Sequence, residues 1–148
     1  MNRSFTLLMT LAAALTVGAC GDGGTGPDDN GGVNTPARQI LANPSYSNVI
    51  QDIFNRKGCA ASSCHGTATQ SAGLNLASGS SYASLVNVAS TQVGTLRVIP
   101  GNANESYLIV KVEGRQTVGQ SMPVGGSVLD NIDLTNLKNW INQGANNN

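Results

Sequence analysis

The chain has 148 residues, a formal net charge of zero and 40% hydrophobic residues. It carries no basic stretch of the kind that nucleic-acid-binding proteins use, so we expect no nucleic-acid partner. It holds one histidine, with no recognisable nucleophile–base pair and no paired carboxylates. This composition argues against an enzyme with a catalytic site of its own.

The N-terminus has the pattern of an export signal. Arg3 supplies a positive charge, and residues 7–17 form an apolar stretch that is too short to span a bilayer comfortably. Small residues stand directly before Cys20, which resembles the cleavage box of a bacterial lipoprotein. We expect a signal peptide over residues 1–19 and a lipid-bearing Cys20, so that the exported protein is anchored to a membrane on its periplasmic or cell-surface side. The alternative is ordinary cleavage near Ala19 that leaves a free Cys20.

Residues 20–37 are rich in Gly, Asp and Asn and have almost nothing to bury, which predicts a flexible tether. One folded domain then covers residues 38–148. Cleavage removes Arg3, so the mature chain has seven basic and eight acidic residues and a net charge of −1. Only five of its residues are aromatic, and a small domain with so thin a core usually needs a staple such as a disulfide or a held cofactor.

The first predicted element of the domain is a helix over residues 45–57. Ser45 or Ser47 can cap its start, and Gly58 ends it. Its apolar stripe consists of Val49, Ile50, Ile53 and Phe54.

Short elements follow in the middle of the chain. We expect an extended segment over residues 73–76, helices over 81–86 and 104–112, and a turn at 98–102. The segment 114–127 is glycine-rich and irregular, and it contains Met122.

A closing helix is predicted over residues 130–143. Asp130, Asn131 or Asp133 can cap it, and Gly144 ends it. Its inward face is expected to consist of Leu134, Leu137, Trp140 and Ile141, with Trp140 as a core anchor. No alternating strand pattern is present, so the predicted fold class is all-α.

The most informative pattern is C-x4-C-H, formed by Cys59, Cys64 and the only histidine, His65. Two cysteines followed directly by histidine are the attachment signature of c-type haem, normally C-x-x-C-H. The imidazole of such a motif becomes an axial ligand of the iron. Residues five apart on an ideal helix point to nearly opposite sides, so both cysteines can reach one haem only if the four residues between them bulge out as a loop.

Two other interpretations of these residues stay open. In an oxidising exported compartment, Cys59 and Cys64 can form a disulfide, which leaves His65 on the surface of a haem-free binding module. The same three residues can also contribute to a metal site, although structural zinc usually takes four protein ligands.

An ordered set of short motifs resembles the small c-type cytochrome domains found in planctomycetes and related bacteria. The resemblance covers residues 49–145, nearly the whole folded part. The motifs are Ile53-Phe54, Cys59 to Gly66, Gly73-Leu74-Asn75-Leu76, Val98-Ile99-Pro100-Gly101, Glu105-Ser106-Tyr107-Leu108, Ser121-Met122-Pro123 and Leu137 to Ala145.

The resemblance implies a class I cytochrome c fold, in which the first and last helices cross and long loops surround a haem cleft. One haem c would be attached covalently to Cys59 and Cys64, with His65 as the proximal ligand and Met122 as the distal ligand of the iron. Met122 is the only methionine outside the signal. Without haem, it is simply an apolar loop residue.

Three further residues are candidates for the haem environment. The resemblance puts the turn at Pro100 near the proximal side, so the Pro100 carbonyl is expected to accept a hydrogen bond from the second ring nitrogen of His65. Arg97 and Tyr107 are candidates for contact with the haem propionates. Otherwise they are a solvated arginine and a tyrosine at the edge of the core.

These observations predict an exported, lipid-anchored monohaem cytochrome that passes single electrons between redox partner proteins. It would transform no substrate. A ligand-binding haem sensor or a peroxidase is the alternative if Met122 is not on the iron. A haem-free lipoprotein with a Cys59–Cys64 disulfide is the alternative if no haem is attached.

Overall fold

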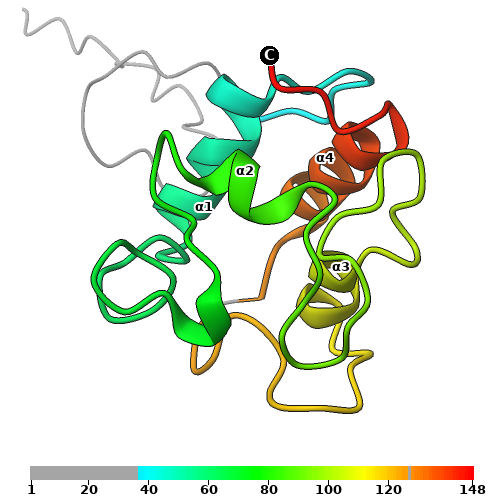
Figure 1. Ribbon diagram of the computed structural model, residues 1–148. Coiled ribbons are helices and arrows are strands. Elements are labelled where there is room, and N and C mark those ends of the chain that lie inside the picture. Colours follow the sequence, from blue (N-terminus) through cyan, green and yellow to red (C-terminus); the bar gives the residue numbers. More distant parts are fainter. Residues whose placement is uncertain (1–36, 127) are drawn as a thin grey trace, which may run out of the picture. The chain divides into compact units, whose positions relative to one another are not determined.

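The computed structural model describes residues 37–126 and 128–148, which belong to one compact unit (Figure 1). The predicted signal peptide over residues 1–19, the lipid-bearing Cys20 and nearly all of the tether over 20–37 lie outside the described residues. None of the helices in the described ranges has the length and apolar character needed to cross a membrane.

The opening helix forms where it was predicted, in two parts. A π-helical turn, η1 (Tyr46–Ile50), continues directly into α1 (Gln51–Arg56). The hydroxyl of Ser45 accepts a hydrogen bond from the backbone N–H of Asn48, so Ser45 is the cap. Gly58 follows the helix with a φ of +71°, a conformation that glycine adopts without strain.

The closing helix, α4 (Asn131–Asn142), begins at Asp130, whose side chain accepts a hydrogen bond from the N–H of Asp133. Leu137, Trp140 and Ile141 are buried as predicted, but Leu134 is only half-buried. Asp133 and Asn136 are buried in addition. The side chain of Asn136 bonds the backbone of residues 39 and 41, which lie along α4 and cover this face.

Three shorter elements complete the helical structure. They are η2 (Ser71–Gly73), α2 (Ser81–Leu85) and α3 (Tyr107–Val112). The helix expected from residue 104 begins later because the Ser106 hydroxyl donates to the Asn102 carbonyl and holds a turn there. Within the described ranges, β pairing is limited to two isolated bridges, Val86 with Val98 and Ala89 with Leu96. The molecule is therefore helical, with long loops between short helices.

The main core lies between the opening helix and the C-terminal part of the chain. The ring of Tyr46 lies 5.1 Å from that of Trp140 and 5.1 Å from that of Tyr82, measured between centroids. The Trp140 indole N–H donates to the carbonyl of Asn146. In addition to this contact with η1, α4 contacts α3. It thereby connects the main core to the segment that forms one wall of the candidate site.

Candidate functional site

The residues between the two cysteines bulge out of the chain as a closed loop. The N–H of His65 donates to the carbonyl of Cys59 at 3.1 Å, across six residues. The N–H groups of Cys64 and Gly66 both donate to the carbonyl of Ala61, each at 2.9 Å. These bonds bring Cys59 next to His65, as a C-x4-C-H spacing requires if both cysteines are to serve one ligand.

Gly66 makes this loop possible. A Cβ atom at this position would lie 2.7 Å from the carbonyl oxygen of Ala60 and 2.8 Å from that of Ala61. Real Cβ atoms do not approach backbone oxygens so closely, so any other residue would push the loop open. Gly66 was named in the sequence only as the last residue of the cysteine/histidine motif, with no structural role.

His65 is held by the chain that follows it. Its Nδ1 atom lies 3.0 Å from the carbonyl oxygen of Ser71. Because a carbonyl only accepts, Nδ1 carries the proton and Nε2 keeps its lone pair. Burial lowers the pKa of His65, which favours this neutral form.

The predicted acceptor for this ring nitrogen was wrong. Pro100 is not among the residues that line the cavity beside His65. The carbonyl of Ser71 takes its place because residues 66–76 fold back: the N–H of Ser71 donates to Cys64, and the N–H of Leu76 donates to His65.

A cavity of about 600 Å³ lies beside the cysteine loop. Its volume falls within the range of roughly 300–1,000 Å³ that small-molecule and cofactor sites occupy. Most of its wall is apolar, contributed by α1, the segment around Leu74, α3, α4 and the loop after α3. Apolar lining residues include Ile53, Phe54, Leu74, Leu76, Leu85, Leu108, Val112, Pro123, Leu129 and Leu137.

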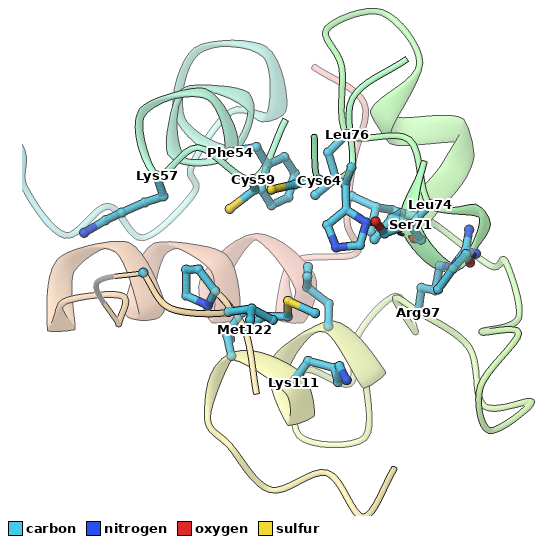
Figure 2. A pocket seen from close by; sticks show the side chains of 18 of the residues that line it. Phe54, Lys57, Cys59, Cys64, Ser71, Leu74, Leu76, Arg97, Lys111 and Met122 are labelled. Carbon is cyan, nitrogen blue, oxygen red and sulfur yellow. Dashed lines mark hydrogen bonds between the residues drawn. The ribbon is translucent and has the colours of Figure 1, made fainter. Parts of the chain in front are cut away.

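The cavity brings together sulfur and nitrogen donors that are far apart in the sequence. Cys59, Cys64, His65 and Met122 all line it. Figure 2 shows the two cysteines on one side and Met122 on the opposite side. The irregular loop that carries Met122 is joined to α3 by a hydrogen bond from the Met122 N–H to the carbonyl of Lys111, at 2.9 Å.

Both cysteines of the loop are free thiols. Cys59 is half-buried, and burial raises its pKa, whereas Cys64 is exposed. No cluster of three or more His, Cys, Asp or Glu side chains suited to a bare metal ion occurs in the part of the chain that the structure describes.

Arg97 and Tyr107 also line the cavity, and neither is a solvated surface residue. The guanidinium of Arg97 donates to the carbonyls of Ser84 and Ala72, at 2.8 and 3.0 Å. Lys111 is a cavity residue that sequence reasoning treated only as part of a helix. A single lysine in the apolar run of α3 was the signal that could have found it.

Ion pairs stabilise the part of the site where the end of α1 meets the start of α4. The carboxylate of Asp133, only 2% exposed, receives two hydrogen bonds from Arg56 and one from Arg38. Lys57, which lines the cavity two residues before Cys59, lies 3.6 Å from the same carboxylate. This cluster attaches the end of α1, and thus the start of the cysteine loop, to the first turn of α4.

No protein-family model, curated protein or solved structure matches this chain. The chemistry of the site follows from the donor atoms that line it. These are two thiols, a thioether and an imidazole whose Nε2 keeps its lone pair, and the cavity around them is largely apolar. Soft sulfur donors and imidazole suit iron and copper better than calcium or magnesium. The apolar wall suits a large apolar cofactor that carries such a metal.

Proposed function

We propose that this protein is a monohaem c-type cytochrome that carries single electrons. The observation that carries the proposal is the gathering of Cys59, Cys64, His65 and Met122 around one apolar cavity of about 600 Å³. A cysteine pair followed by histidine is the haem c attachment pattern, and the closed loop at residues 59–66 explains how a longer gap can serve the same purpose.

Each residue of the site has a role in this proposal. Cys59 and Cys64 would hold the cofactor covalently, each through a thioether to one vinyl group. His65 would offer Nε2 to the iron, while the Ser71 carbonyl fixes the imidazole ring and its tautomer. Met122 would offer its thioether to the same iron. The haem supplies a one-electron change at iron, and His/Met ligation favours a raised potential.

The finer fold in the proposal is that of a class I cytochrome c. The contact between η1 and α4 supports it, because the first and last helices of that fold pack against each other. Residues of the loops at 58–76 and 114–126 line the cavity, and this supports the proposal because long loops surround the haem in that fold. In this proposal the haem does the redox work, and the protein transforms no substrate of its own.

Localisation and partners belong to the same proposal. With a lipid on Cys20 and a Gly-rich tether over residues 20–37, the cytochrome is held at a membrane on the periplasmic or cell-surface side. The tether lets one anchored domain reach more than one redox partner protein.

The test is covalent haem. The exported protein is expressed together with cytochrome maturation proteins, and a denaturing gel is stained for haem peroxidase activity. We expect a stained band that is weaker in each single cysteine variant and absent in the double variant Cys59→Ser/Cys64→Ser. A colourless protein with a Cys59–Cys64 disulfide in mass spectra would overturn the proposal and favour the haem-free binding module.

A second measurement tests the distal ligand. Methionine on ferric iron gives a weak band near the red end of the visible spectrum, and Met122→Ala should remove it while covalent haem remains. A spectrum unchanged by Met122→Ala would instead favour a haem sensor or a peroxidase with an open iron position. His65→Ala should disturb the ligation in either case.

A further inference from the structure

The basic residues of the domain fall into two groups. The structure describes seven lysines and arginines, and five of them lie within 4 Å of a carboxylate. Those five are Arg38, Arg56, Lys57, Arg115 and Lys138. Arg97 and Lys111 pair with no carboxylate of the described residues, although they are the most buried of the seven, each 7% exposed.

The contacts of these two cations are neutral. The Nζ atom of Lys111 lies 3.3 Å from the carbonyl oxygen of Val118 and 5.7 Å from the centre of the Tyr107 ring. Arg97 donates only to backbone carbonyls. Burial lowers the pKa of both groups, as expected where a charge leaves water without an opposite charge. Buried charges are normally paired, so this arrangement is incomplete by itself.

Both cations line the cavity, together with polar neighbours. The Tyr107 hydroxyl lies 3.4 Å from the Gln92 side-chain oxygen, and a Cβ at Gly119 would touch both Gln92 and Lys111, at 3.1 and 3.2 Å. We call this cluster the basic end of the cavity; it consists of Ser90, Gln92, Arg97, Tyr107 and Lys111. In Figure 2, Arg97 and Lys111 lie toward the side of the view opposite Lys57.

The composition of the rest of the cavity wall indicates what kind of ligand the basic end would bind. No aspartate or glutamate is among the described residues that line the cavity. The wall is otherwise mainly apolar and carries the sulfur and imidazole donors. A ligand that is complementary to both the apolar wall and the basic end has an apolar body and carries anionic groups on one edge only.

From this arrangement we infer that the basic end binds the carboxylates of the ligand, with Lys111 and Arg97 as their counter-ions. The inference rests on the proposed function, in which the ligand is haem and the carboxylates are its two propionates. Lys111 would then be a cofactor-binding residue that, with Arg97, holds the propionate groups of the haem. Because Lys111 is only 7% exposed, we expect its pairing with a carboxylate to be weakly screened and to affect the redox equilibrium.

The experiment is a redox titration of the covalently loaded protein over about pH 4 to 7, where unpaired carboxylates titrate. For the wild type we expect a potential that is independent of pH, because paired propionates stay ionised in both oxidation states. In Lys111→Gln, the loss of one cation should favour the ferric form about tenfold, which for one electron lowers the potential by about 59 mV. The unpaired propionate should then take up a proton on reduction, so the potential should rise as the pH falls.

The pH dependence separates this role from a structural one. No described lining residue is a carboxylic acid, and the carboxylates nearest the wall, Glu113 and Asp133, are paired with cations in both the wild type and Lys111→Gln. An acidic titration that appears only in Lys111→Gln is therefore assigned to the ligand. The matched control is Lys138→Gln, which removes a lysine that pairs with Glu113 and does not line the cavity. Lys111→Arg should restore a potential that does not depend on pH.

Three results would overturn the inference. The first is a wild-type potential that already changes with pH over this range, and this measurement needs no variant. The second is a Lys111→Gln protein that titrates like Lys138→Gln while its haem stays covalently bound; the proposed function would then stand. The third is a wild type without covalent haem, which would overturn the proposed function as well.

Discussion

The two sides of this domain treat buried polar groups differently. Between η1, α1 and α4, such groups have partners within the protein: Asp133 meets Arg38, Arg56 and Lys57. Around the cavity, by contrast, two buried cations face only neutral groups, and the Nε2 lone pair of His65 is left over for a ligand. The helical core is complete in itself, whereas the cavity wall has the composition of a binding surface.

The buried tyrosine of the core shows how complete that side is. The Tyr46 hydroxyl donates to Ser81, whose hydroxyl donates in turn to Gln51, and Gln51 donates to the carbonyl of Leu76. Burial raises the pKa of Tyr46 to about 12, so it stays a neutral donor. This chain of bonds ends at Leu76, a cavity residue, and so links the finished core to the wall of the site.

The largest expected effect comes from breaking the core. Trp140 is 1% exposed and packs against Tyr46, so Trp140→Ala should lower the free energy of unfolding by about 3–5 kcal/mol. Chemical denaturation followed by circular dichroism measures it. Val128→Ala, at a side chain that is 72% exposed, is the control and should change stability by less than about 0.5 kcal/mol. A loss below about 1 kcal/mol for Trp140→Ala would contradict the assignment of the core.

Removing the charge of Asp133 should have the next largest effect. Asp133→Asn leaves three cations around a neutral amide, and we expect a loss of roughly 2–3 kcal/mol in the free energy of unfolding. This is below the 3–5 kcal/mol of a fully buried pair, because water still reaches Arg38 and Arg56. The control is Asp52→Asn, which removes the exposed carboxylate on α1 that also pairs with Arg56. Equal losses in the two variants would show that the cluster does not stabilise the core.

A substitution in the wall of the cavity should reduce binding of the cofactor more than it reduces the stability of the fold. Gly66→Ala forces a Cβ against two carbonyl oxygens, and overpacking of this kind costs about 1–3 kcal/mol locally. We expect the yield of covalent haem to fall while the helical circular dichroism stays close to that of the wild type. Ser62→Ala, in the exposed part of the same loop, should load haem normally. A wild-type yield of covalent haem in Gly66→Ala would contradict the prediction, because it would show that haem attachment does not need the closed loop.

The smallest effect concerns Asp130 and acid. Its pKa is lowered from 3.8 to about 2, chiefly because its carboxylate accepts the N–H of Asp133, with a further contribution from Arg38. The unfolded chain therefore binds this proton first, so the stabilisation is complete above about pH 4 and is lost as the pH falls toward 2. Asp130→Asn keeps a helix cap but cannot titrate, so its denaturation midpoint should fall less steeply over that range. Parallel acid dependence in both proteins would refute this.

Local patterns in the sequence were enough to predict much of the fold. Ser45 and Asp130 cap their helices as expected, and Gly58 and Gly144 follow them with positive φ values. These features could be predicted because caps and stops depend on a few neighbouring residues. The start of α3 was missed because a side chain, Ser106, competes with the helix for the backbone.

The sequence by itself also determined which donors the chain possesses: one histidine, one methionine beyond residue 9, and a cysteine pair that needs a bulged loop. Only the tertiary structure decided which residues face those donors. The carbonyl of Ser71, and not that of Pro100, bonds the His65 ring. Asp133 and Asn136 are buried on α4, whereas Leu134 is only half-buried, and Lys111 lines the cavity. These outcomes depend on contacts between segments far apart in the chain. Spacing along one segment carries no information about the charge or carbonyl that another segment brings beside it.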